Sequence, residues 1–334
     1  MQRSREDFQI YIGRGYKMLS VIIPTLNRSE YLKQAVESIL NQTLSADNYE
    51  IIVVDNGSGD DTKTVIHELN EKNNSRIKFV LEPAPGLHNG RHRGAKESKG
   101  AILVFADDDI IAAPGWLRAI HKTFKDPTVA LVGGKILPKW EGDVPKWIDF
   151  FRNQTEYGWT IGHLSLLDLG DIRKEIPAHY VYGCNFSIRK SVLFECGGFH
   201  PDAMPQELIK YRGDGETALS RKITEKGHRA VYEPEATVFH QVPGERLTVD
   251  YFCRRAFNQG VSDSFTEMRS NGGVCKTTEK RGIGDIINRL IMIVREQPIQ
   301  RKGRASYLKG KEFHRKSVEA DPELLSYVLR ETYF

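Results

Sequence analysis

The chain of 334 residues is too long for one small domain and fits either one large α/β domain with appendages or two domains. Hydrophobic residues make up 40% and charged residues 28%, which excludes collagen-like, coiled-coil and wholly disordered proteins. The 48 Lys and Arg against 44 Asp and Glu leave a formal charge of +4. Because this balance is too even for a protein whose whole surface is basic, we expect no nucleic-acid partner.

Cysteine usage and hydropathy bear on the cellular compartment. The four cysteines are widely spaced and form no C-x-x-C pair, which argues against a zinc site or a disulfide scaffold and favours a reducing environment. No apolar stretch approaches the roughly eighteen residues of a membrane span, and the first residues lack the apolar core of a signal peptide. We therefore expect a cytoplasmic protein, soluble or attached peripherally to the inner face of the membrane.

Residues 19–132 alternate between strand and helix patterns. Short apolar runs predict buried strands, and amphipathic periodicity predicts helices between them. The strands are expected at 19–23, 51–54, 77–81, 101–106 and 129–132, and the helices begin near Ser29, Asp60, Leu87 and Pro114. Strands that alternate with helices form a mostly parallel sheet covered on both faces, so the predicted fold class is α/β.

The pattern changes beyond Pro138, where aromatic residues lie among glycines and polar residues without a clear period. We predict a long loop region that serves as a binding surface. Regular structure returns with strands at 180–188, 230–232 and 236–240 and helices at 214–226 and 248–269. The chain is therefore divided into an extension at 1–17, a first half at 18–138, a second half at 139–265 and a tail at 266–334.

Three consecutive carboxylates, Asp107, Asp108 and Asp109, follow the apolar run at 101–106. In open α/β sheets, ligands bind outside the carboxyl ends of the strands, which is where these residues fall. Mg²⁺ and Mn²⁺ prefer oxygen ligands and commonly join one or two carboxylates to substrate phosphates. The run on its own fits equally well a solvated turn whose Asp side chains cap the helix near Pro114.

Polar residues also end the first and second strands, and with the Asp triplet they form a set of motifs. These are V-I-I-P-T-L-N-R at 21–28, V-V-D-N-G-S-x-D-D-T at 53–62, P-G-L-x-x-G-R at 85–91, D-x-D at 107–109 and G-C-N-F-S-I-R-K-S-V-L-F-E-C-G-G-F at 183–199. In this combination, residues 19–263 closely resemble the family-two glycosyltransferases, which share the GT-A fold. The resemblance implies a Rossmann-like nucleotide-sugar-binding half at 18–138, an acceptor-binding half at 139–265 and a helical tail.

The resemblance also implies roles for residues of the donor site. Pro24, Thr25 and Arg28 would border the base pocket, and Asp55 would accept a hydrogen bond from the base, commonly uracil. Asp55 also suits a plain turn with the Asn-Gly pair that follows it.

Gly86 and Arg91 match the family's helix before the D-x-D, where the arginine neutralises phosphate or holds the donor. Relatives usually carry Asn where this chain has His92. Arg91 also fits a solvated basic helix face, together with Arg93, Lys96 and Lys99.

The D-x-D of the family implies a divalent cation, Mn²⁺ or Mg²⁺. Asp109 would bind it, Asp107 would hold the ribose or share the ion, and Asp108 would belong to the same donor site. His240, at a strand end, matches a histidine that reaches the metal or the diphosphate in many relatives, and Arg246 would reinforce it. A lone histidine at a strand end is otherwise an ordinary feature.

On the acceptor side, Gly183 and Asn185 match the family's loop under the sugar. Counting back from Leu219 places Glu216 in the position of the family's catalytic base, although relatives commonly carry Glu-Asp where this chain has Gly-Glu. Asp214 is predicted to cap the helix, and Glu216 also fits a first-turn carboxylate favoured by the helix dipole. A different register would make Asp214 the base.

The resemblance therefore implies an inverting, metal-dependent enzyme of the hexosyltransferase type. It would move a sugar from a nucleotide diphosphate-sugar, most commonly a UDP-sugar, to a glycan or lipid-linked acceptor in glycan or polysaccharide biosynthesis. The Q-x-x-R-W signature of processive synthases is absent after His240, which favours a single transfer. Two alternatives remain open: a catalytically silent nucleotide-sugar-binding module, and a nucleotidyltransferase, although the expected early Gly-rich phosphate loop is lacking.

The stretch at 276–316 carries twelve Lys or Arg and four Asp or Glu, a local charge of +8. Apolar residues between 286 and 294 could form one face of an amphipathic helix, a combination that binds anionic membrane surfaces. This stretch is therefore a candidate for peripheral membrane contact, and the alternative is a helix packed on the catalytic domain with a solvated basic face.

Overall fold

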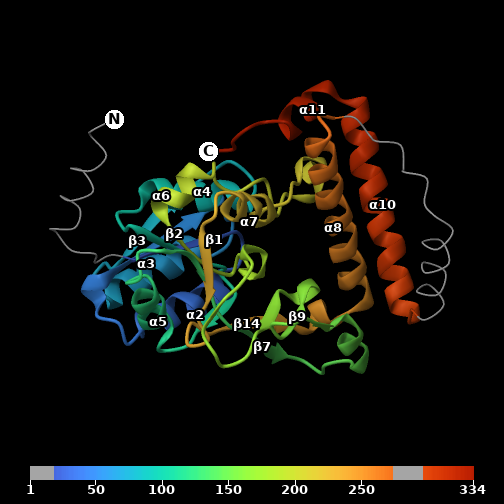
Figure 1. Cartoon of the computed structure of the whole chain (residues 1–334). Helices are drawn as coiled ribbons and strands as arrows, with labels where there is room; N and C mark the ends of the chain where they lie inside the picture. Colours follow the sequence, from blue (N-terminus) through green and yellow to red (C-terminus); the bar gives the residue numbers. More distant parts are fainter. Residues whose placement is uncertain (1–18, 274–295) are drawn as a thin grey trace.

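The computed structural model describes residues 19–273 and 296–334. Within them, an eight-stranded sheet forms the centre of the fold, with α4, α6 and α7 above it and α2 and α5 below it in Figure 1. Its strands, in spatial order, are β11 (Lys174–Glu175), β13 (Arg229–Tyr232), β6 (Val129–Gly133), β12 (Asn185–Arg189), β4 (Ile102–Ala106), β1 (Leu19–Thr25), β2 (Tyr49–Asp55) and β3 (Ile77–Leu81). The five strands predicted between 19 and 132 are all present.

The central sheet is mixed. The strands β1, β2, β3 and β4 pair in parallel, as do β6 and β13, whereas β12 runs antiparallel between β4 and β6. Every residue of β1, β4 and β6 is buried, which explains their continuous apolar sequences. The covering helices are α2 (Ser29–Leu40), α3 (Thr62–Lys72), α4 (Leu87–Glu97), α5 (Trp116–Thr123), α6 (Lys190–Glu195) and α7 (Glu216–Glu225).

A second, six-stranded sheet takes several short strands from the region that we predicted to be a long loop. Its spatial order is β5 (Ile110–Ala112), β14 (Val238–Pro243), β7 (Ile136–Glu141), β10 (Leu166–Asp168), β9 (Trp159–Ile161) and β8 (Asn153–Gln154). The loop prediction was wrong because strands of two or three residues are too short to show an alternation of polar and apolar residues. In this sheet, His240 of β14 pairs with Ile110 of β5, which sets the histidine beside the Asp triplet.

Short 3₁₀ turns link these strands and helices. They are η1 (Ala46–Asn48), η2 (Lys146–Phe151), η3 (Gly162–Leu164), η4 (Ala178–Tyr180), η5 (Gln206–Tyr211) and η6 (Gly244–Leu247).

The C-terminal part forms a helical unit of α8 (Val249–Ser270), α10 (Pro298–Ala320) and α11 (Pro322–Val328), with α8 and α10 side by side (Figure 1). The last residues then return to α4, where the Phe334 ring stacks on His92 at 4.1 Å between centroids. None of the described helices has both the length and the apolar character needed to cross a membrane. The predicted amphipathic helix at 286–294 lies outside the described residues.

Glycines allow α8 and α10 to approach each other closely. A Cβ added to Gly310 would clash with the carbonyl oxygen of Phe257, and one added to Gly260 would clash with that of Tyr307. By contrast, a Cβ added to Gly303, seven residues before Gly310 in α10, would meet no atom within 4 Å. The packing of the two helices therefore depends on Gly260 and Gly310 and not on Gly303.

We expect Gly310→Ala to lower the free energy of unfolding by about 1–3 kcal/mol, because the backbone of α8 must move to relieve the clash. Gly303→Ala is the matched control and should be neutral or raise stability by up to about 1 kcal/mol, since alanine favours the helix. Urea unfolding of the two variants tests this expectation. Equal effects of the two substitutions would contradict the close packing of α8 on α10.

Candidate functional site

The site forms where β1 and β4 end and lies beside β14, which carries His240 within the strand and not at its end as we predicted. The residues of the Asp triplet follow β4 directly, Thr25 ends β1, and the pairing of β14 with β5 brings His240 to the same edge. A cavity of about 370 Å³ opens beside them. It is lined by Asn27, Arg28, Ser29, Glu30, Tyr31, Asp60, Asp109, Gln241, Pro243, Glu245 and Arg246.

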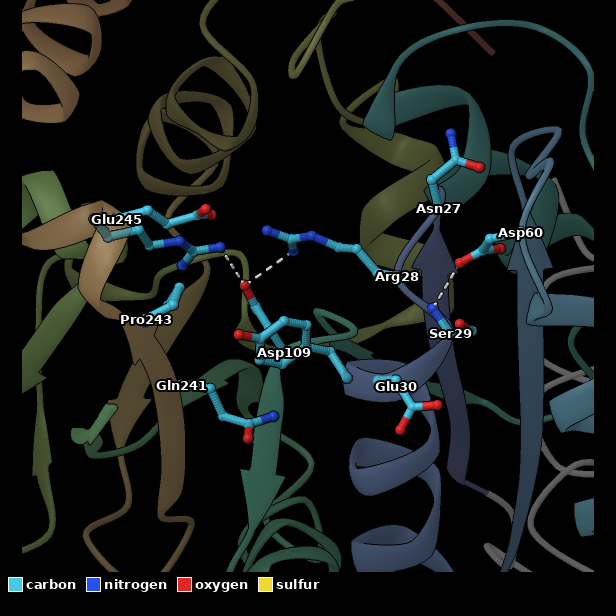
Figure 2. Close-up of a pocket in the computed structure, with 11 residues that line it drawn as sticks. Asn27, Arg28, Ser29, Glu30, Asp60, Asp109, Gln241, Pro243 and Glu245 are labelled. Atoms are coloured by element: carbon cyan, nitrogen blue, oxygen red, sulfur yellow. Dashed lines mark hydrogen bonds and ion pairs between the residues drawn. The ribbon is translucent and has the colours of Figure 1, made fainter. Parts of the chain in front are cut away.

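Asp109 is almost fully buried and is approached from two sides. Its Oδ2 accepts hydrogen bonds from Arg28 Nη1 at 3.0 Å and Arg246 Nη2 at 2.5 Å. Figure 2 shows Arg28 on one side of Asp109 and the segment of Pro243 and Glu245 on the other. Burial opposes ionisation of Asp109, but the positive charges of Arg246 and Arg28 hold its pKa well below the ordinary value, so the carboxylate is anionic.

The other oxygen of Asp109 faces His240. The Nδ1 of His240 lies 2.9 Å from the carbonyl oxygen of Leu164, which can only accept, so Nδ1 carries the proton. The Nε2 lies 3.2 Å from Arg246 Nη1, which can only donate, and so presents a lone pair. It also lies 3.2 Å from Asp109 Oδ1, and this oxygen is buried without a hydrogen-bond donor. A buried oxygen and an imidazole nitrogen that converge in this way fit a divalent cation.

No group of three or more His, Cys, Asp or Glu residues that could hold a metal occurs within 19–273 and 296–334. The pair of Asp109 and His240 would thus need further oxygen atoms from a substrate. This agrees with the way Mg²⁺ and Mn²⁺ are commonly held, through one or two protein ligands together with phosphate oxygens.

Asp108 points back into the fold. Its Oδ2 accepts a hydrogen bond from Thr25 Oγ1 at 2.8 Å and its Oδ1 one from Arg28 Nη1 at 2.8 Å. Burial raises the pKa of Asp108 to about 6, against the lowering effect of Arg28. Asp108 therefore links the ends of β1 and β4 and orients Arg28 toward Asp109.

Arg91 lies inside the site and not on a solvated helix face. Its side chain is only 3% exposed, with Nη2 3.2 Å from Asp107 Oδ1 and Nη1 3.7 Å from Glu216 Oε2. Gly183 provides the space, because a Cβ at this position would clash with the Arg91 guanidinium. One buried cation thus joins the first residue of the D-x-D to the candidate base.

Glu216 is the first residue of α7 and keeps 29% of its side chain exposed. Its Oε1 accepts a hydrogen bond from the Gly183 amide at 3.2 Å. Burial raises the pKa of Glu216, and Arg91 acts in the opposite direction. This carboxylate is fixed from one side and open on the other, as a general base requires.

Asp214 does not cap α7, so that prediction was wrong. The N-cap residue is Gly215, and Asp214 instead lies buried between His200 Nδ1 at 2.7 Å and Thr266 Oγ1 at 2.7 Å. Both of its oxygens are therefore held inside the protein, and they tie the start of α7 to α8. His200 and Thr266 are distant in sequence, and no motif marked either of them.

The remaining predicted residues of the donor site lie at the turn after β2 and beside α4. Asp55 accepts a hydrogen bond from the Ser58 amide at 2.9 Å, and thus stabilises the turn after β2. Gly86 is the N-cap of α4 with φ of 108°. Pro24 packs against the same helix, since a Cβ on Gly90 would lie 3.0 Å from its side chain.

The Asn185 amide belongs to the interior of the protein. Its Nδ2 donates to the carbonyl oxygens of Ala236 at 2.8 Å and Lys135 at 3.2 Å, and its Oδ1 accepts from Trp116 Nε1 at 2.9 Å. This network fastens β12 to its neighbours. We therefore leave the Asn185 side chain out of the ligand-binding groups.

His92, which replaces the usual Asn, also has a structural role. Its Nε2 accepts a hydrogen bond from the Phe199 amide at 2.9 Å, and its Nδ1 lies 3.2 Å from the carbonyl oxygen of Tyr333. Burial lowers the pKa of His92 to about 3, so the ring is neutral. It connects α4 to the last residues of the chain.

Comparisons with known proteins agree with this architecture. A glucosyl-dolichyl phosphate glucuronosyltransferase of Haloferax volcanii is 26% identical over 253 residues, which cover 75% of this chain and 77% of that protein. A GalNAc(5)-diNAcBac-PP-undecaprenol beta-1,3-glucosyltransferase of Campylobacter jejuni is 35% identical over 130 residues, 38% of this chain and 41% of that protein.

Among solved structures, a mannosyltransferase of Pyrobaculum calidifontis in complex with GDP-Man and Mn²⁺ matches with a TM-score of 0.55 at 17% identity, over 89% of this chain and 86% of that one. The fold is the GT-A fold that the motifs predicted. The family model of glycosyl transferase family 2 matches residues 20–197, more than half of the chain. The chain belongs to glycosyl transferase family 2 and is a glycosyltransferase.

Proposed function

We propose that this glycosyltransferase is inverting and metal-dependent, and that it moves one sugar from a nucleoside diphosphate-sugar to an acceptor hydroxyl in a single transfer. One observation carries the proposal. The buried Arg91 guanidinium pairs with Asp107 of the D-x-D and with the partly exposed Glu216, so the donor motif and the candidate base share one cation. This arrangement would set a bound donor next to the hydroxyl of the acceptor.

Glu216 is the proposed base. It would take the proton of the acceptor hydroxyl while the hydroxyl oxygen attacks the anomeric carbon from the face opposite the diphosphate. The bond between the anomeric carbon and the diphosphate oxygen breaks at the same time, and the electron pair leaves with the diphosphate. The Gly183 amide and Arg91 favour the ionised form of the Glu216 carboxylate and orient it. No covalent intermediate is required.

The cation, Mn²⁺ or Mg²⁺, would be held by Asp109 Oδ1 and His240 Nε2 together with oxygens of the diphosphate. When bound, it neutralises charge on the leaving diphosphate. Arg28 and Arg246 contact the same carboxylate and would donate hydrogen bonds to the phosphates.

For the donor, we propose a UDP-sugar bound by Pro24, Thr25, Asp55 and Asp107, as the family motifs imply. The structural neighbour from Pyrobaculum calidifontis holds GDP-Man, so both nucleotides need to be tested. A thermal-shift screen of UDP- and GDP-sugars with and without Mn²⁺ is the experiment, because a ligand that binds only the native state raises the melting temperature. We expect stabilisation by a UDP-sugar that chelation abolishes. Stabilisation by none of the nucleotides would contradict the proposal.

For the acceptor, we propose a glycan or lipid-linked sugar at an anionic membrane surface. The names of the Haloferax and Campylobacter relatives include dolichyl phosphate and undecaprenol. In α10, the exposed Lys302, Lys309 and Lys316 recur every seven residues, and Leu308 and Phe313 are exposed nearby. Replacement of the three lysines by glutamine should weaken co-sedimentation with anionic vesicles, whereas unchanged, salt-independent binding would contradict the membrane contact.

The pH profile tests the link between Arg91 and Glu216. Glu216 acts in its ionised form, and the Arg91 charge lowers its pKa. Loss of that charge in Arg91→Gln raises the pKa of Glu216 further, so the acidic limb of kcat/KM should move to higher pH. Arg91→Lys, which keeps the charge, should remain near the wild-type profile. An acidic limb that does not move in Arg91→Gln would show that Arg91 does not control the base.

A further inference from the structure

The Arg246 guanidinium contacts both groups that would hold the cation. Its Nη2 donates to Asp109 Oδ2 at 2.5 Å, and its Nη1 lies 3.2 Å from His240 Nε2. Since a guanidinium can only donate, the lone pair of Nε2 accepts this hydrogen bond. The lone pair that a metal would need is therefore engaged by Arg246.

Arg28 provides a natural comparison. It also donates to Asp109 Oδ2, at 3.0 Å, but the structure gives it no hydrogen bond or ion pair with His240 and instead pairs it with Asp108 at 2.8 Å. The Arg28 side chain is 38% exposed, whereas that of Arg246 is 11% exposed. The two arginines thus bring equal charge to one carboxylate, but only Arg246 covers the imidazole.

Resting on the proposed function, we infer that Arg246 takes the place of the cation in the ligand-free enzyme and turns to the diphosphate when nucleotide and metal bind. The cavity of about 370 Å³ lies next to Arg246 and Arg28 and gives the guanidinium room to move. Arg246 then gives up its hydrogen bonds to Asp109 and His240 and donates charge-assisted hydrogen bonds to phosphate oxygens in their place.

A consequence of this arrangement is coupling between the two ligands. The metal alone must displace a buried guanidinium and then share the site with its positive charge, so it binds weakly. A diphosphate draws the guanidinium away and opens the lone pair of His240 to the metal. By thermodynamic reciprocity, the metal also tightens nucleotide binding by the same factor.

Calorimetric titration of Mn²⁺ into the full chain, without nucleotide and at saturating UDP or GDP, tests the inference. For the wild type, we expect nucleotide to tighten Mn²⁺ binding by about ten- to hundredfold. For Arg246→Ala, Mn²⁺ alone should bind about tenfold more tightly, because a neighbouring positive charge and a competing donor are gone. The added effect of nucleotide should then largely disappear.

Arg28→Ala is the matched control, since it removes the same charge from Asp109 but leaves His240 covered. It should tighten the binding of Mn²⁺ alone clearly less than Arg246→Ala does. Arg246→Gln serves as a second variant if Arg246→Ala does not fold. Unchanged or weaker binding of Mn²⁺ alone in the Arg246 variants, or an equal gain in Arg28→Ala, would overturn the inference while the proposed function stands. If the wild type fails to bind Mn²⁺ in the presence of UDP and also in the presence of GDP, both the inference and the proposed function would be overturned.

Discussion

Glu216→Gln is expected to lower the rate of transfer by roughly two to four orders of magnitude, the usual contribution of a positioned general base. The amide keeps the shape of the side chain and can still accept the hydrogen bond from the Gly183 amide, but it cannot take a proton. Binding of nucleotide and Mn²⁺ should remain near wild type, because Glu216 contacts neither Asp109 nor His240. Transfer kinetics and calorimetry of the same preparation measure the two effects.

Asp214→Asn is the control for this experiment. Asp214 is a neighbouring carboxylate, but it holds His200 and Thr266 together inside the protein. Its replacement should lower the unfolding free energy by about 1–3 kcal/mol, the cost of disturbing a buried charged hydrogen bond, and should leave most of the turnover. The reverse result, an inactive Asp214→Asn and a nearly normal Glu216→Gln, would make Asp214 the base.

Asp109→Ala should abolish transfer together with the Mn²⁺ dependence of nucleotide binding. Removal of this carboxylate takes away the buried Oδ1 that faces His240 and leaves Arg28 and Arg246 without their shared partner. Because loss of even an indirect contact to a metal ligand commonly costs ten- to hundredfold in affinity, loss of the ligand itself should exceed about a hundredfold. Asp109→Asn, which keeps the volume, should show the same loss of Mn²⁺ binding if the variant with alanine is unstable.

The control for Asp109 is its neighbour in the chain. Asp108 accepts hydrogen bonds from Thr25 and Arg28, and the structure gives it no hydrogen bond or ion pair with His240, so Asp108→Asn should retain Mn²⁺-dependent nucleotide binding. Full activity of the wild type in excess chelator would contradict a metal-dependent reaction.

Much of the central sheet could be predicted from the sequence, because buried parallel strands produce unbroken apolar runs such as those of β1 and β4. The Asp triplet could be placed at a strand end for the same reason. The second sheet could not be predicted, since β8, β9 and β10 are each two or three residues long. That sheet brings His240 beside Asp109, so the sequence motifs alone could not predict the distance between these two residues.

Long-range contacts account for the other differences. An Asp just before a helix is the usual sequence pattern of an N-cap, which is why we predicted this role for Asp214. In the structure, partners 14 and 52 residues away in the sequence hold its side chain instead. Likewise, Arg91 lies in a strongly basic helix that suggests solvent exposure, yet Gly183 leaves a space that its guanidinium fills. Residue type and spacing indicated that Asp214 and Arg91 are important, but their contact partners could be identified only in the folded chain.

The stereochemistry of the released sugar tests the central claim most directly. The slow hydrolysis of an α-linked nucleotide-sugar by the wild-type chain can be followed by proton NMR within the first minutes, before the free sugar equilibrates between its anomers. With Glu216 as a general base acting from the face opposite the diphosphate, the β-anomer appears first, and Glu216→Gln slows its appearance. The α-anomer as the first product would contradict an inverting reaction with Glu216 as the base.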